Sequence, residues 1–237
     1  MTCRAGWLFG GCLLLAACTG VRPYDPVPAA EVAGVYLRKG VAYMERGNYP
    51  VARQDLQKAL ALDPRNSVVH NALAVLAERL EQSAEAIGHF EEALRLDPAN
   101  LAARNNYARY LCGHGQAREA LVQFRQVTDA RRYAHPQMAL TNAGLCAESS
   151  GDAATAEHYL RQALALQADF APALLAMARI SQAGGRSLPA RGFLARYLEV
   201  AESDAEVLQL GMAIERSLGN DTAVEDYARR LSSRVVP

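Results

Sequence analysis

Residues 56–66 read LQKALALDPRN, and residues 90–100 read FEEALRLDPAN, the same pattern 34 positions later. Apolar residues recur in both stretches at the three- and four-residue spacing that places them on one face of a helix. An Asp-Pro pair then ends each helix, because proline has no amide hydrogen and restrains the residue before it. Residues 160–169, LRQALALQAD, repeat the pattern without the proline. A period of this length with a helix stop indicates a solenoid of helix-turn-helix repeats, each of which buries its apolar face against its neighbours.

Six repeats can be aligned, and they predict an all-α, right-handed superhelical solenoid in residues 33–237. The repeats lie near residues 33–66, 67–100, 101–136, 137–170, 171–203 and 204–237. Their alternation of large and small residues is similar to the tetratricopeptide repeat. In the first repeat, Gly40 and Ala52 should let the two helices approach closely, and Gly47 should form the turn between them.

Three local features follow from the same alignment. The connection at residues 128–136 is longer than its counterparts, by about two residues. Ser67 is expected to cap the first helix of the second repeat, because a serine hydroxyl can accept a bond from a free amide at a helix start. The second helix of the fifth repeat is expected to begin near Pro189, since proline is favoured in the first turn.

The N-terminus predicts a lipoprotein signal peptide at residues 1–17. A basic start containing Arg4 precedes an apolar run that is too short to span a bilayer. The run ends in Leu15-Ala16-Ala17-Cys18, which resembles the lipobox of bacterial lipoproteins and makes Cys18 the expected lipidation site. The alternative is an ordinary secretory signal that happens to contain a cysteine. Thr19, in place of aspartate, implies the outer membrane by the sorting rule of that family, and residues 18–32 would be the lipidated cysteine and a proline-rich tether.

Composition excludes several classes of function. The chain carries 25 basic and 25 acidic side chains with no basic stripe, so nucleic acid is not an expected partner. No nucleophile with an adjacent base and no phosphate-binding loop occurs, and the histidines have no metal-ligand spacing. We therefore expect a protein that is not an enzyme, with no cofactor, no metal and no small-molecule substrate. The histidines, read as satisfied or solvated side chains, are His70, His89, His114, His135 and His158.

Cys112 and Cys146 lie in neighbouring repeats and leave two readings open. A disulfide is possible in an oxidising compartment. However, packed helices lie about 8–10 Å apart, and a disulfide has demanding geometry. We therefore expect two small, buried, unpaired apolar residues.

The first helices of the repeats should line the inner surface of the solenoid and bind an extended or helical peptide. Apolar side chains that the repeat does not need for packing often mark binding sites, and they gather in the first repeat. The alternative is that the tether folds back over them. The candidate protein-binding residues are Leu37, Val41, Met44, Asn71, Val75, Asn105 and Arg109.

The whole chain resembles the type IV pilus biogenesis and stability lipoproteins, the PilF/PilW pilotins. The resemblance is carried by the lipobox, the short tether, the six repeats, Asn105-Asn106-Tyr107 and the long connection at residues 128–136. At residues 142–145 the family usually has Asn-Leu-Gly-Leu, so Ala143 is a departure.

The resemblance implies a non-enzymatic factor that binds the secretin subunit and is anchored by its lipid to the periplasmic face of the outer membrane. There it promotes localisation and multimerisation of the secretin. The remaining alternatives are another periplasmic scaffold lipoprotein in outer-membrane protein or cell-wall assembly, and a helper module of a peptidoglycan or polysaccharide enzyme.

Overall fold

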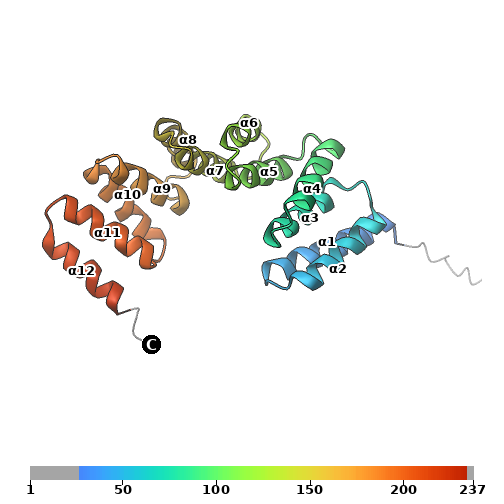
Figure 1. Ribbon diagram of the computed structural model, residues 1–237, viewed down its shortest axis with the longest axis horizontal. Coiled ribbons are helices and arrows are strands. Elements are labelled where there is room, and N and C mark those ends of the chain that lie inside the picture. The colour runs from blue at the N-terminus through green and yellow to red at the C-terminus, as the bar shows by residue number, and fades with distance from the viewer. Residues whose placement is uncertain (1–26, 234–237) are drawn as a thin grey trace, which may run out of the picture.

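The computed structural model describes residues 27–233, and all regular structure in this range is α-helical (Figure 1). The prediction of an all-α tetratricopeptide solenoid with six helix pairs is confirmed. The helices are α1 (Ala29–Glu45), α2 (Tyr49–Leu62), α3 (Ser67–Arg79), α4 (Ser83–Leu96), α5 (Leu101–Gly113), α6 (Ala117–Thr128), α7 (Pro136–Ser149), α8 (Ala153–Leu166), α9 (Ala171–Ala183), α10 (Ser187–Val200), α11 (Ala205–Ser217) and α12 (Asp221–Ser232).

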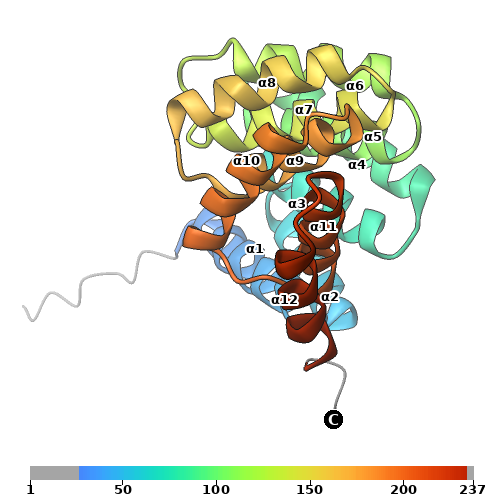
Figure 2. The ribbon, with the colours of Figure 1, turned by 90° about the vertical axis from the view of Figure 1, so that its left-hand side faces the viewer.

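Consecutive helices form antiparallel hairpins, and the six hairpins stack into a curved array that is arch-shaped in Figure 1. Each first helix also contacts the first helix of the next repeat, from α1 and α3 through to α9 and α11. The backbones of successive second helices do not come into contact within the described chain. First helices such as α5 and α7 therefore lie on the inner side of the arch, and α6 and α8 on its outer side (Figure 1). Figure 2 shows the same array end-on, with the terminal hairpins on one side and α6–α8 on the other.

Within each repeat, a small residue on the first helix faces a large residue on the second. A Cβ added to Gly40 would lie 2.7 Å from Cγ of Leu56, closer than real Cβ contacts allow. The small residue therefore sets how closely the two helices approach. The same relation recurs 16 positions apart in every repeat, as Gly40–Leu56, Ala74–Phe90, Ala108–Phe124, Gly144–Leu160, Ala178–Leu194 and Gly211–Tyr227.

The turn between the two helices of a repeat needs one residue in the left-handed region. Gly47 supplies it in the first repeat with a φ of 74°, as the sequence predicts. In the second repeat Glu81 takes the corresponding position with a φ of 58°, an uncommon conformation for a residue with a side chain. The hairpin geometry therefore overrides the local preference of Glu81.

Several element boundaries differ from those expected. Helix α1 begins at Ala29, so residues 29–32 belong to the first helix and not to the tether. Asn66 caps α3, because its side-chain oxygen accepts bonds from the backbone amides of Val68 and Val69, whereas Ser67 is already helical. The Ser67 hydroxyl donates instead to the carbonyl of Ala93. Helix α10 begins at Ser187, two residues before Pro189.

The lengthened connection spans residues 129–135, whereas the other inter-repeat connections are 63–66, 97–100, 167–170 and 201–204. It is three residues longer than these, where about two were expected. The signal peptide, Cys18 and most of the tether lie outside the described residues. Among residues 27–233, no helix combines the length and the hydropathy that a bilayer span requires.

We predict opposite effects from the same substitution at two glycines. Gly144→Ala would place a Cβ 2.8 Å from Cγ of Leu160, and should lower the free energy of unfolding by about 1–3 kcal/mol through overpacking. No neighbouring atom lies within 4 Å of the Cβ that Gly88→Ala would add, so this substitution should raise the free energy of unfolding by up to about 1 kcal/mol. Urea unfolding followed by circular dichroism measures both. Equal shifts in the two variants would show that close helix approach does not limit residue 144.

Candidate functional site

The inner surface of the first two repeats contains a depression of about 440 Å³, which we call the N-terminal groove. Its apolar lining comes from α1 and α3, because residues three, four and seven apart share one helix face. The polar lining comes from Arg38 and Glu45 of α1, Asn71 of α3 and Asn106 of α5. The lining residues are Leu37, Arg38, Val41, Ala42, Met44, Glu45, Val68, Asn71, Ala72, Val75 and Asn106.

The structure brings five of the predicted binding residues together in this groove, namely Leu37, Val41, Met44, Asn71 and Val75. Their accessibility differs. Met44 is only 7% exposed and belongs mainly to the core formed by α1, α2 and α3. Val68, which the alignment did not single out, is 51% exposed and gives the groove its most accessible apolar side chain.

Asparagine side chains connect successive first helices along the inner surface. Asn106 of α5 lines the N-terminal groove, and its Nδ2 donates to Oδ1 of Asn71 over 3.0 Å. Asn105, the predicted binding residue, is 5% exposed and accepts a bond of 3.3 Å from Nδ2 of Asn142. Asn105 therefore ties α5 to α7, and its neighbour Asn106 occupies the position expected of it.

A second depression, the central groove, has a volume of about 420 Å³ and lies between α5 and α7. Arg109, the last of the predicted binding residues, is in its lining and not in the N-terminal groove. The Arg109 guanidinium is ion-paired with Glu78 of α3 at 3.0 Å, so it ties α5 to α3. The lining residues are Arg109, Cys112, Gly113, Phe124, Asn142, Leu145, Cys146 and Ser149.

Cys112 and Cys146 form a disulfide in the central groove, so the expectation of two unpaired cysteines was wrong. Their Cα atoms are 5.7 Å apart. The separation of helix axes overstates this distance, since each Cα lies about 2.3 Å from its own axis and toward the partner helix. Ala108 and Ala143 are fully buried in the apolar core that also contains the two cysteines, and their small side chains add little bulk between α5 and α7. The Cα separation is therefore within the range of about 4.4–6.8 Å that is usual for disulfides.

We predict that the disulfide stabilises the folded chain. It closes a sequence separation of 34 residues, and removing it should lower the free energy of unfolding by about 2–4 kcal/mol. The test is urea unfolding of the double variant Cys112→Ser/Cys146→Ser beside the parent protein. The parent in reducing agent is the control and should match the variant. An unchanged midpoint in both would contradict the prediction.

His70 and His89 form hydrogen bonds within the protein. His70 is buried, and its Nε2 donates to the carbonyl of Pro64 at 3.2 Å. Its Nδ1 must then accept from Nδ1 of His89, 3.0 Å away. Burial, and secondarily the neighbouring His70, lower the pKa of His89. The pair is a satisfied contact between α3 and α4, which confirms the sequence interpretation for these two residues.

Two grooves on the inner surface are typical of a binding scaffold. Comparison with known proteins shows which proteins the chain is similar to. Models of the tetratricopeptide repeat match residues 37–100 and residues 139–170. Type IV pilus assembly protein PilF of Pseudomonas aeruginosa is 25% identical over 235 residues, which cover 98% of this chain and 93% of PilF. The chain is a tetratricopeptide-repeat protein related to PilF.

Solved structures extend this relationship. The crystal structure of PilW, described as a widely conserved type IV pilus biogenesis factor, has a TM-score of 0.80 and 29% identity, covering 86% of this chain and 93% of PilW. The solved structure of Pseudomonas aeruginosa PilF also has a TM-score of 0.80, with 25% identity, covering 87% of this chain and 93% of that structure. The similarity to PilF and PilW supports a tetratricopeptide-repeat protein of type IV pilus biogenesis.

Proposed function

We propose that the protein is a pilotin, a lipid-anchored protein on the periplasmic face of the outer membrane. It binds secretin subunits through its inner surface and promotes their outer-membrane localisation and multimerisation. The observation that carries the proposal is the N-terminal groove. An apolar depression on the inner side of a chain related to PilF and PilW provides a surface for a protein client.

The chemistry of the groove favours a polypeptide ligand. Val68, Leu37 and Val41 offer apolar contact, and burying such side chains on binding contributes about 25 cal/mol per Å². Asn71 and Asn106 lie at the edge of the apolar patch, and an amide side chain can both donate to and accept from a peptide backbone. The central groove continues this surface toward α7. An apolar anchor flanked by amide groups suits one segment of an extended or helical client.

The anchor adds membrane affinity that a secretin subunit does not itself carry. Nine residues separate Cys18 from Pro28, the residue before α1, and the ten steps along the chain reach at most about 35 Å when fully extended. Because α1 both follows the tether and lines the N-terminal groove, a client bound there would be held close to the membrane. A lipid-modified Cys18 would thus deliver the client to the bilayer in which it assembles.

We predict that Val68→Asp abolishes capture of the secretin subunit without unfolding the protein. The side chain is half exposed, so aspartate buries no charge in the free protein but leaves one unpaired against an apolar client. Affinity for the purified secretin subunit should fall at least tenfold, with circular dichroism unchanged.

The matched control is Val122→Asp on α6, because Val122 is 50% exposed but lies on an outer helix. It should bind the secretin subunit as the parent does. Equal binding by all three proteins would reject the groove as the contact, and equal loss in both variants would show a non-specific charge effect.

We predict that Cys18→Ser removes the protein from the outer membrane. Serine has no thiol to receive the lipid, so cell fractionation should find the variant in the soluble periplasm and the secretin largely as unassembled subunits. Cys3→Ser, in the same N-terminal segment, is the control and should leave both distributions unchanged. Retention of Cys18→Ser in the membrane fraction would contradict the proposed anchor.

A further inference from the structure

The outer side of the array contains a cleft between α8 and α10, which we call the arginine cleft. Its lining residues are Arg161, Pro189, Gly192, Phe193 and Arg196, and its volume is about 320 Å³. It exists because α8 and α10 each pack on α9, while their own backbones do not come into contact. It lies on the opposite side of the array from the two inner grooves.

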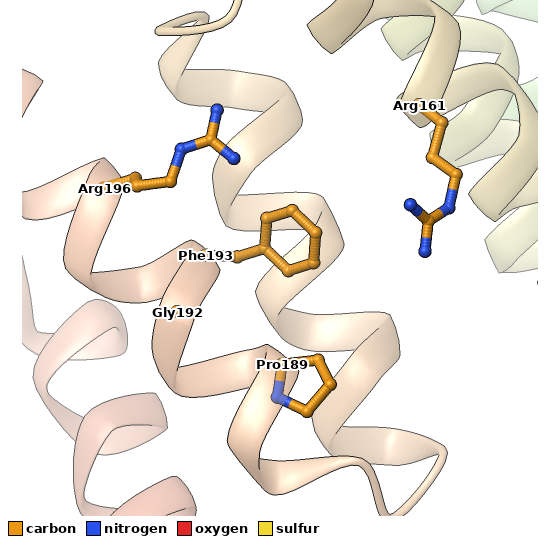
Figure 3. Close-up of a pocket in the computed structure, with 5 residues that line it drawn as sticks. All are labelled: Arg161, Pro189, Gly192, Phe193 and Arg196. Carbon is orange, nitrogen blue, oxygen red and sulfur yellow. The ribbon is translucent and has the colours of Figure 1, made fainter.

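The floor of the arginine cleft is apolar. Phe193 is partly buried, and it packs against apolar core residues on both sides of α9. The rest of its ring faces the cleft beside Pro189 (Figure 3). No atom lies within 4 Å of the position that a Cβ on Gly192 would take, so the glycine leaves the floor open.

The walls of the cleft are cationic. Figure 3 shows the guanidinium groups of Arg161 and Arg196 on opposite sides of the Phe193 ring. The Arg196 guanidinium lies 5.9 Å from the ring centroid and donates to the carbonyl of Ala168, a neutral acceptor that leaves its charge uncompensated.

On the other wall, Arg161 pairs with Glu157, whose carboxylate also binds Arg186 at 2.8 Å. One carboxylate thus serves two guanidinium groups, and no acidic residue lines the cleft itself. The cleft therefore carries net positive charge around an apolar floor.

We propose that the arginine cleft binds an acidic segment of a partner protein, with an apolar side chain on Phe193 and a carboxylate between Arg161 and Arg196. Charge complementarity selects the occupant. Guanidinium groups bind carboxylates through paired N–H donors, and the exposed face of an aromatic ring takes an aliphatic or aromatic side chain. A purely apolar segment would leave both guanidinium groups desolvated, and a small anion would leave the Phe193 ring uncovered. The proposal concerns a second contact surface and does not depend on the function proposed for the N-terminal groove.

The test uses the purified full-length protein and a dye-labelled hexapeptide probe, Asp-Asp-Leu-Phe-Asp-Asp, with binding followed by fluorescence anisotropy. The control peptide carries asparagine in place of each aspartate and should bind at least tenfold more weakly. The double variant Arg161→Gln/Arg196→Gln should lose at least tenfold in affinity for the acidic probe, because both cationic walls are neutralised.

A second pair of variants separates blockage of the cleft from general effects on the helices. Gly192→Leu fills the open floor and should also lose at least tenfold. Gly88→Leu places the same side chain at the matching position of α4, where there is likewise no atom within 4 Å, and should bind as the parent does. Circular dichroism should show all the variants to be folded.

Three outcomes would overturn the proposal. The first is unchanged affinity of Gly192→Leu or of the arginine double variant. The second is equal binding of the acidic and asparagine peptides, which would remove the charge argument. The third is displacement of the probe by inorganic phosphate at a concentration that equal chloride does not match, which would make the cleft a small-anion site.

Discussion

The contact between a small residue on the first helix of each repeat and a large residue on the second is the constraint on which the molecule depends. Gly40 admits Leu56, and Ala74 admits Phe90, at the same spacing in the chain. Each large side chain is almost fully buried in the repeats that use leucine or phenylalanine, and such burial is worth about 1.5–3 kcal/mol. Because this contact fixes the hairpin, the orientation of every inner and outer helix follows from it.

The two sides of the array differ because the helices on them are spaced differently. First helices contact one another, so their exposed side chains form a continuous inner surface with an apolar N-terminal end. Second helices diverge, and the space between α8 and α10 becomes a separate cleft with cationic walls. One scaffold therefore presents two chemically distinct surfaces. An apolar client on the inner side and an acidic partner on the outer side would not compete for the same residues.

Most of the fold could be predicted from the sequence because its signals are local. The period of the apolar residues, the Asp-Pro stops and the glycine at residue 47 each depend on neighbours within one repeat. The predictions that failed depend on how repeats meet. To predict the disulfide between Cys112 and Cys146, one must know the distance between the two facing backbones. To predict that Asn106 lines the groove and that Asn105 is buried, one must know how α5 is rotated about its axis. The arginine cleft had no sequence signal, since a gap between two helices leaves no pattern in either.

The cross-link between Cys112 and Cys146 lies in the two repeats that the longest connection joins, at residues 129–135. A longer connection alone would leave the third and fourth repeats less tightly coupled, because more chain is free to move between them. The covalent bond removes that freedom, since the bond does not yield to the forces that separate packed side chains. The array is therefore stiffer between its third and fourth repeats than between repeats that no disulfide joins. Any widening of the arch to admit a bulky client must therefore come from the repeat interfaces on either side of the third and fourth repeats.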